Sequence, residues 1–166
     1  FPRSVLVLCA DNGVIAQGVT QSSHDVTAIV TENLAKKRTA VCRMANVANC
    51  QVIPVDMGVL DFPPTEGVLD RRIGNATGDI SQGPSMTREQ AAKAVLTGIQ
   101  LVAQQKEQGV RLLATGEMGI GNTTTSSAVA CVLLSREASQ LTGRGAGLSR
   151  EGLERKIRVV EQAISR

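Results

Sequence analysis

The stretch that decides the fold is Val110–Leu134, VRLLATGEMGIGNTTTSSAVACVLL. Val110–Thr115 is a short apolar run of the kind that forms a buried strand. Thr123–Leu134 is a longer run, apolar on nearly every side, which predicts a buried helix. Between them, Gly116–Asn122 contains three glycines. A strand, a glycine-rich turn and a helix in this order are typical of one unit of an α/β fold.

Similar units precede this stretch, and a further helix follows it. Two further apolar runs predict buried strands, Ser4–Ala10 (SVLVLCA) and Gln51–Met57 (QVIPVDM). Helices are predicted at Asp25–Ala35, at Ala40–Asn49, from the capping-box pair Thr87 and Gln90 up to Gly109, and after a Ser149 cap near the end of the chain. We therefore expect residues 1–166 to form a single α/β domain, a Rossmann-like three-layer fold with a mostly parallel sheet and helices on both faces.

The loop regions indicate where ligands bind. Gly58–Met86 shows no convincing periodicity, and loops this long are more often functional than idle. In open parallel sheets, ligands bind beyond the carboxyl ends of the strands. Chemistry is therefore expected at Asp11–Gly13, from Asp56 onward and from Gly116 onward.

Composition excludes several classes of function. Of the 166 residues, 42% are hydrophobic and 20% charged, and the net charge is only +3. Two Phe with no Tyr or Trp argue against a nucleic-acid surface. A single His and no C-x-x-C pair argue against a metal site, and no apolar run reaches the length of a membrane span. Each Cys lies in an apolar stretch and is expected to act as a small core residue in a cytoplasmic protein; these are Cys9, Cys42, Cys50 and Cys131.

The glycine turn has the features of an anion-binding loop. Glycines let the backbone approach an anion, and the N–H groups at the start of the next helix point toward it. Asn122 stands where a P-loop requires Lys, and Thr124 replaces the last glycine of the dinucleotide fingerprint. A single phosphate therefore suits the loop better than a triphosphate or a dinucleotide. Two alternatives remain open here: glycines that serve only close strand–helix packing, and a small-molecule kinase with a degenerate loop.

Five motifs in order along the chain resemble one family. They are ADNGV (10–14), VDMGV (55–59), GPSMTREQA (83–91), GEMGIGNTT (116–124) and GRGAGLS (143–149). The sequence resembles nicotinate-nucleotide–dimethylbenzimidazole phosphoribosyltransferases of cobalamin lower-ligand synthesis. The resemblance implies transfer of the ribosyl phosphate of nicotinate mononucleotide to 5,6-dimethylbenzimidazole or a related base. The products are α-ribazole 5′-phosphate and nicotinate, with no cofactor or metal, in a cytoplasmic homodimer.

The resemblance also implies roles for particular residues. The family's general base is a glutamate that would lie beyond Arg166, so Glu117 is expected only to support catalysis by stabilising positive charge on the sugar. The alternative for Glu117 is a carboxylate bonded to nearby N–H groups. Ser22 and Met118 match positions that line the pocket of the acceptor base. Phosphate binding is implied for the backbone of Gly119, Gly121 and Asn122, the Thr123 hydroxyl and Lys156.

Members of that family are considerably longer than this chain. We therefore expect it to be the central part of a larger catalytic domain, without the family's N- and C-terminal segments. We expect the isolated chain to bind the nucleotide without turning it over. A non-catalytic nucleotide-binding module of the same fold is the main alternative.

Overall fold

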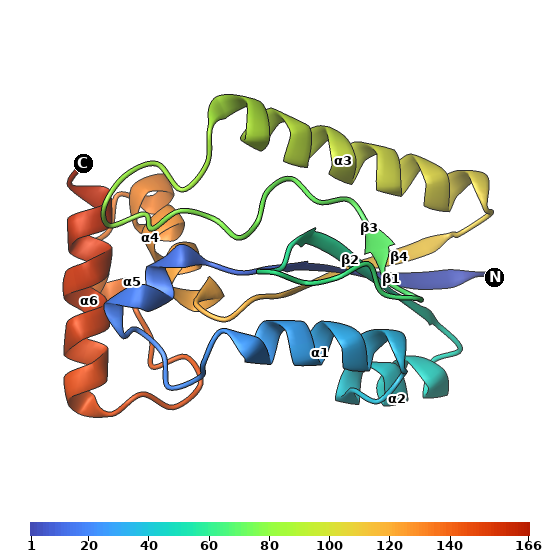
Figure 1. Ribbon diagram of the computed structural model, residues 1–166, viewed down its shortest axis with the longest axis horizontal. Helices are drawn as coiled ribbons and strands as arrows, with labels where there is room; N and C mark the ends of the chain where they lie inside the picture. Colours follow the sequence, from blue (N-terminus) through green and yellow to red (C-terminus); the bar gives the residue numbers. More distant parts are fainter.

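A computed structural model describes all 166 residues, Phe1–Arg166. Its centre is a four-stranded parallel sheet in the order β3-β2-β1-β4. Figure 1 shows α1 and α2 on one face of the sheet and α3 on the other, which confirms the three-layer α/β prediction. The strands are β1 (Arg3–Ala10), β2 (Gln51–Gly58), β3 (Leu69–Asp70) and β4 (Leu112–Met118), and these helices are α1 (Asp25–Ala35), α2 (Ala40–Val47) and α3 (Arg88–Glu107).

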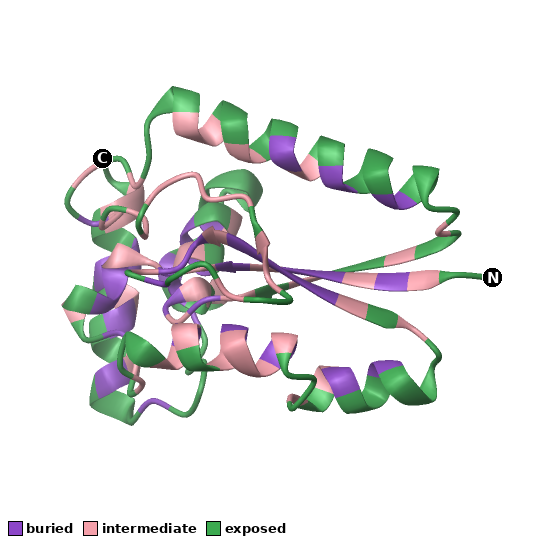
Figure 2. Ribbon diagram, turned by 45° about the vertical axis from the view of Figure 1, so that its right-hand side comes forward, coloured by how far each residue is buried: buried purple, intermediate pink, exposed green.

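The core lies on both faces of β1, the central strand. Successive side chains of a strand point to opposite faces. Leu6 packs with the α3 residue Leu101, whereas Val7 packs with the α1 residue Leu34 on the other face. Figure 2 shows the buried positions concentrated on the central strands and on the helix surfaces that face them.

Several predicted boundaries agree with the structure. Helix α1 has the predicted bounds, and α3 begins at a complete capping box. Thr87 Oγ1 accepts a hydrogen bond from the Gln90 N–H at 3.1 Å, and Gln90 Oε1 accepts one from the Thr87 N–H at 2.8 Å. Ser149 caps the last helix by accepting from the Gly152 N–H at 3.1 Å.

Other elements differ from the prediction. Strand β4 continues three residues beyond Thr115, because Glu117 and Met118 still pair with β1. The long loop contains the short strand β3, which pairs with β2, and the 3₁₀ turn η1 (Gly13–Gln17) follows β1. A short helix, α5 (Ala138–Leu141), was also not predicted.

Helices α4 (Asn122–Leu134), α5 and α6 (Arg150–Ile164) form a separate group at the carboxyl end of the sheet (Figure 1). The prediction that α4 is buried is wrong. Ala128 and Cys131 pack against Val160 of α6, but the opposite side of α4 is open to solvent. Its exposed apolar residues are Val129, Val132, Leu133 and Leu134, with exposures between 58% and 76%. The helix lies beyond the sheet, so the sheet covers neither of its sides.

The apolar residues of α3 that recur at helical spacing, among them Val95, Leu101 and Val102, are also only partly buried. Leu101 faces the sheet, whereas Val95 and Val102 are exposed. The buried face of α3 includes Thr97 and Gln105, which the hydrophobic pattern did not select.

Three of the four cysteines are buried, as expected, and Cys50 is half-buried; all four are free thiols. Burial raises the pKa of the Cys9 thiol to about 11, so this side chain is a neutral core residue at physiological pH. None of the helices is long and apolar enough to span a membrane.

Asp56 fixes the start of the long loop at the end of β2. Its Oδ1 accepts hydrogen bonds from the N–H groups of Gly58 at 2.9 Å and Val59 at 2.8 Å. Its Oδ2 forms an ion pair with Arg72 Nη2 at 2.6 Å. Only 4% of Asp56 is exposed, so removing the carboxylate leaves the Gly58 and Val59 N–H groups without an acceptor where water reaches poorly, and Arg72 loses its ion pair.

Asp56→Ala is expected to lower the free energy of unfolding by about 3 kcal/mol, because it leaves one cation and two N–H groups without their acceptor. Equilibrium denaturation in urea measures this change. Glu66→Ala is the matched control, since Glu66 is exposed and makes no hydrogen bond; it should change stability by at most about 0.5 kcal/mol. Equal effects of the two substitutions would contradict the role given to Asp56.

Candidate phosphate site

The glycine turn after β4 is held in place by β1, η1 and α1. A side chain at Gly119 would overlap the carbonyl oxygen of Ala10, so the turn lies directly against the end of β1. The Ile120 N–H donates to Thr27 Oγ1 at 3.1 Å, and the Ile120 carbonyl accepts from Asn12 Nδ2 at 3.2 Å. These contacts fix the direction in which α4 begins.

Helix α4 begins with free backbone donors. Gly121, its N-cap, has φ +91° and supplies no side-chain cap. The Asn122 N–H already donates to the Gly119 carbonyl at 3.0 Å, whereas the N–H groups of Gly121 and Thr123 make no hydrogen bond within the chain. Unsatisfied N–H groups at the positive end of a helix dipole favour an anion.

Lys156 supplies a buried positive charge beside these donors. It lies on α6 with 1% of its surface exposed, and its Nζ donates to Thr123 Oγ1 at 2.7 Å. No carboxylate forms an ion pair with it. Burial lowers the pKa of Lys156, because the charged form loses hydration that no counter-ion replaces. Two of its three N–H donors have no partner, so they are available to an anion in the cavity.

The loop between α5 and α6 closes the site from the outside. Gly145 has φ +57°, and a Cβ there would lie 2.9 Å from Thr123 Oγ1 and 3.3 Å from Lys156 Nζ. The loop backbone therefore passes close to both groups, with no room for a side chain at this position. Together these segments enclose a cavity of about 100 Å³. Its charged lining residues are Arg144 and Lys156, and no carboxylate lines it.

The structure brings together four of the residues for which phosphate binding was predicted. Gly121, Asn122, Thr123 and Lys156 line the cavity, whereas Gly119 lies against Ala10 and does not. Sequence reasoning missed Arg144 and Gly145, although both lie in the GRGAGLS motif. The closely spaced glycines of that motif are the sequence feature that could have indicated a second loop at the site.

The remaining predicted site residues lie outside the cavity. The exposed Glu117 carboxylate accepts a hydrogen bond from the Asn122 side-chain amide. The half-buried Met118 packs against a core cluster that includes Val7 and Cys9. The Ser22 N–H donates to Thr20 Oγ1 at 3.2 Å. The roles of Glu117, Ser22 and Met118 stay predictions.

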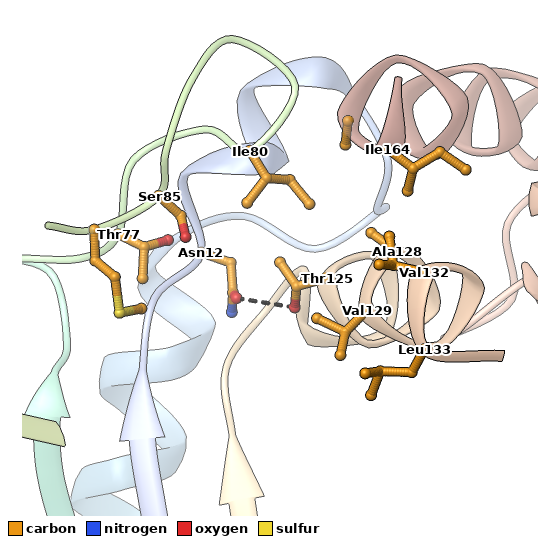
Figure 3. Close-up of a pocket in the computed structure, with 12 residues that line it drawn as sticks. Asn12, Thr77, Ile80, Ser85, Thr125, Ala128, Val129, Val132, Leu133 and Ile164 are labelled. Atoms are coloured by element: carbon orange, nitrogen blue, oxygen red, sulfur yellow. Dashed lines mark hydrogen bonds between the residues drawn. The ribbon is translucent and has the colours of Figure 1, made fainter. Parts of the chain in front are cut away.

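A larger cavity of about 520 Å³ lies on another side of the first turn of α4 (Figure 3). Asn12 and Thr125 face each other there, and Thr125 Oγ1 donates to Asn12 Oδ1 at 3.3 Å. Val129, Val132 and Leu133 give it an apolar wall, and none of its lining residues is charged. It therefore has no group that could neutralise a phosphate, unlike the smaller cavity.

The sequence model of a family described as "Phosphoribosyltransferase" matches residues 2–166. The chain belongs to this phosphoribosyltransferase family. Two curated relatives carry the name nicotinate-nucleotide–dimethylbenzimidazole phosphoribosyltransferase. The protein from Ruminiclostridium cellulolyticum is 45% identical and the one from Acetivibrio thermocellus 46% identical, each over 98% of this chain and 46% of the relative.

A solved structure has nearly the same fold as this chain. The crystal structure of CobT from Thermus thermophilus superimposes with a TM-score of 0.96 at 37% identity. It matches over 99% of this chain and 50% of the solved chain. The chain thus spans about half the length of the curated relatives and of the solved structure that it matches.

Lys156→Met is expected to raise the stability of the ligand-free chain by about 1 kcal/mol, because it replaces an unpaired buried charge with an apolar side chain. The melting temperature should rise by about 2–4 °C at neutral pH. Lys106→Met on the exposed surface of α3 is the control and should have little effect.

The gain should shrink in alkaline buffer. The folded pKa of Lys156 lies below its ordinary value of 10.5, so the unfolded chain binds more protons between the two values. The parent chain therefore becomes more stable as pH rises through that window, and the advantage of Met falls. Thermal unfolding across this pH range measures the effect. A variant less stable than the parent at neutral pH would show that Lys156 stabilises the fold instead.

Proposed function

We propose that the protein containing this chain transfers the phosphoribosyl group of nicotinate mononucleotide to 5,6-dimethylbenzimidazole or a related base. The observation that carries the proposal is the cavity in which the unpaired Lys156 meets the free N–H groups of Gly121 and Thr123. This arrangement suits one phosphate group, and the curated relatives are named for a reaction whose donor carries one. The products would be α-ribazole 5′-phosphate and nicotinate.

In this reaction the bond between the anomeric carbon and the nicotinate nitrogen breaks, and its electron pair goes to nicotinate. One ring nitrogen of the acceptor base forms the new bond with its lone pair, and the proton on the other ring nitrogen goes to a general base. The phosphate serves as a handle that fixes the ribose, so binding energy far from the reacting carbon positions it. No cofactor takes part.

We assign supporting roles to residues at the carboxyl end of the sheet. The Glu117 carboxylate, at the end of β4, would stabilise positive charge that develops on the ribose. Ser22 and Met118 would contribute to the pocket of the acceptor base. The general base would come from a part of the protein outside this chain, as the family resemblance implies.

The proposal includes a cytoplasmic homodimer. The exposed apolar side of α4 supports an assembly, because contiguous apolar surface on a protein often marks an interface. The alternative is a non-catalytic module that binds the nucleotide on the same fold.

Turnover separates these two hypotheses. Replacing the matched 162 residues of the Ruminiclostridium cellulolyticum relative with this chain should yield a protein that forms α-ribazole 5′-phosphate from nicotinate mononucleotide and dimethylbenzimidazole. The isolated chain should bind the mononucleotide but form no product, since the proposed general base is missing. Liquid chromatography with mass spectrometry detects the product.

The same hybrid protein with the additional substitution Lys156→Met is the internal control. Its kcat/KM should be at least about tenfold lower, because the phosphate loses a hydrogen bond from a charged donor. An inactive but folded hybrid that still binds the mononucleotide would support the non-catalytic module. Consumption of ATP by the isolated chain would support a kinase instead.

A further inference from the structure

Arg144 is the second charged residue of the phosphate cavity, and no interpretation of the sequence had assigned it a role. It lies in the loop between α5 and α6, directly before Gly145, whose backbone passes close to Thr123 and Lys156. The rest of the cavity lining is neutral apart from Lys156. Any anion inside the cavity would therefore have these two cations in the wall around it.

The charge of the ligand requires more than one cation. A phosphate monoester carries about −1.5 to −2 charge at pH 7. Lys156 supplies at most one positive charge, and its burial disfavours even that charge. No metal-ligating carboxylate lines the cavity to recruit a divalent cation. Arg144 is the remaining group in the cavity wall that could complete the neutralisation.

Arg144 is held in place with most of its donors free. Its Nη1 donates to the Leu148 carbonyl at 2.8 Å, and the Leu148 N–H donates to the Arg144 carbonyl at 3.1 Å. These two bonds close the loop on itself. A guanidinium has five N–H donors in a planar fork that matches two oxygens of a phosphate. No carboxylate forms an ion pair with Arg144.

An acidic residue whose charge interacts with Arg144 already has other hydrogen-bond partners. Glu151 stands in the first turn of α6. Hydrogen bonds from its own backbone N–H and from the Ser149 hydroxyl lower the pKa of Glu151, and the charge of Arg144 contributes less. Glu151 thus stays ionised near Arg144 without engaging its guanidinium.

We propose that Arg144 binds the phosphate of the nucleotide from the loop side of the cavity, opposite the glycine turn, and thereby makes the site selective for a dianionic phosphate ester. This proposal rests on the proposed function, in which a phosphate occupies the cavity. Arg144 would act in binding and positioning, with no part in the bond-breaking step.

The test is calorimetric titration of the chain with nicotinate mononucleotide and with nicotinate riboside, which lacks the phosphate. Arg144→Gln should weaken mononucleotide binding about tenfold or more and leave riboside binding unchanged. The affinity of Arg144→Lys for the mononucleotide should lie between those of the parent and of Arg144→Gln. Lysine keeps the positive charge but lacks the planar pair of N–H donors that a guanidinium offers to two phosphate oxygens. Arg158→Gln on α6 removes the same charge from an exposed position outside the cavity and should change affinity less than about twofold.

The outcomes separate this inference from the proposed function. If Lys156→Met abolishes mononucleotide binding while Arg144→Gln behaves like Arg158→Gln, the role of Arg144 is overturned and the phosphate site stands. If the parent chain binds mononucleotide and riboside equally, the phosphate site and the role of Arg144 both fail. Melting temperatures of the Arg144 variants should stay close to that of the parent, since Arg144 is exposed and its side chain gives up only one hydrogen bond within the chain, to the Leu148 carbonyl.

Discussion

The whole site depends on the close approach between Gly119 and the Ala10 carbonyl. Only a residue without a side chain fits there, and this contact places the end of β4 against the end of β1. The hydrogen bonds of Ile120 to Thr27 and Asn12 then fix the turn from both sides. Helix α4 consequently starts with its free N–H groups aimed at α6. The same glycines therefore allow the close packing of this turn and leave its N–H groups free to bind an anion.

The second determinant is a charge that the fold tolerates without a partner. Buried lysines are normally neutralised by a carboxylate or excluded from the core. Lys156 is buried and has no carboxylate partner. Its hydrogen-bond partner is the Thr123 hydroxyl, and the loop at Gly145 lies over it. A fold that keeps such a group gives up stability for a preorganised anion site. The favourable interaction with phosphate is then available without rearrangement of the protein.

The features of the fold and of the site that could be predicted from the sequence are those that depend on residues close together along the chain. The bounds of α1 and the capping box of α3 follow from short-range patterns, and the structure confirms them. The prediction that α4 is buried was wrong, because an apolar sequence pattern does not show which elements pack against a helix. In this fold nothing covers Val132 and Leu133, which face solvent. Lys156 entered the candidate site only through family resemblance, because a lysine on a helix is usually solvated. Arg144 was missed because its loop reaches the glycine turn only through tertiary contacts.

The most direct test of the phosphate site is a nuclear magnetic resonance titration of the isotope-labelled chain with nicotinate mononucleotide. We predict that the largest shifts fall on the backbone amides of Gly121, Thr123 and Gly145 and on the side-chain nitrogen of Lys156. Nicotinate riboside should leave these signals nearly unchanged. Shifts confined to the larger cavity, at Thr125, Val129 and Leu133, would place the nucleotide elsewhere and contradict the phosphate site.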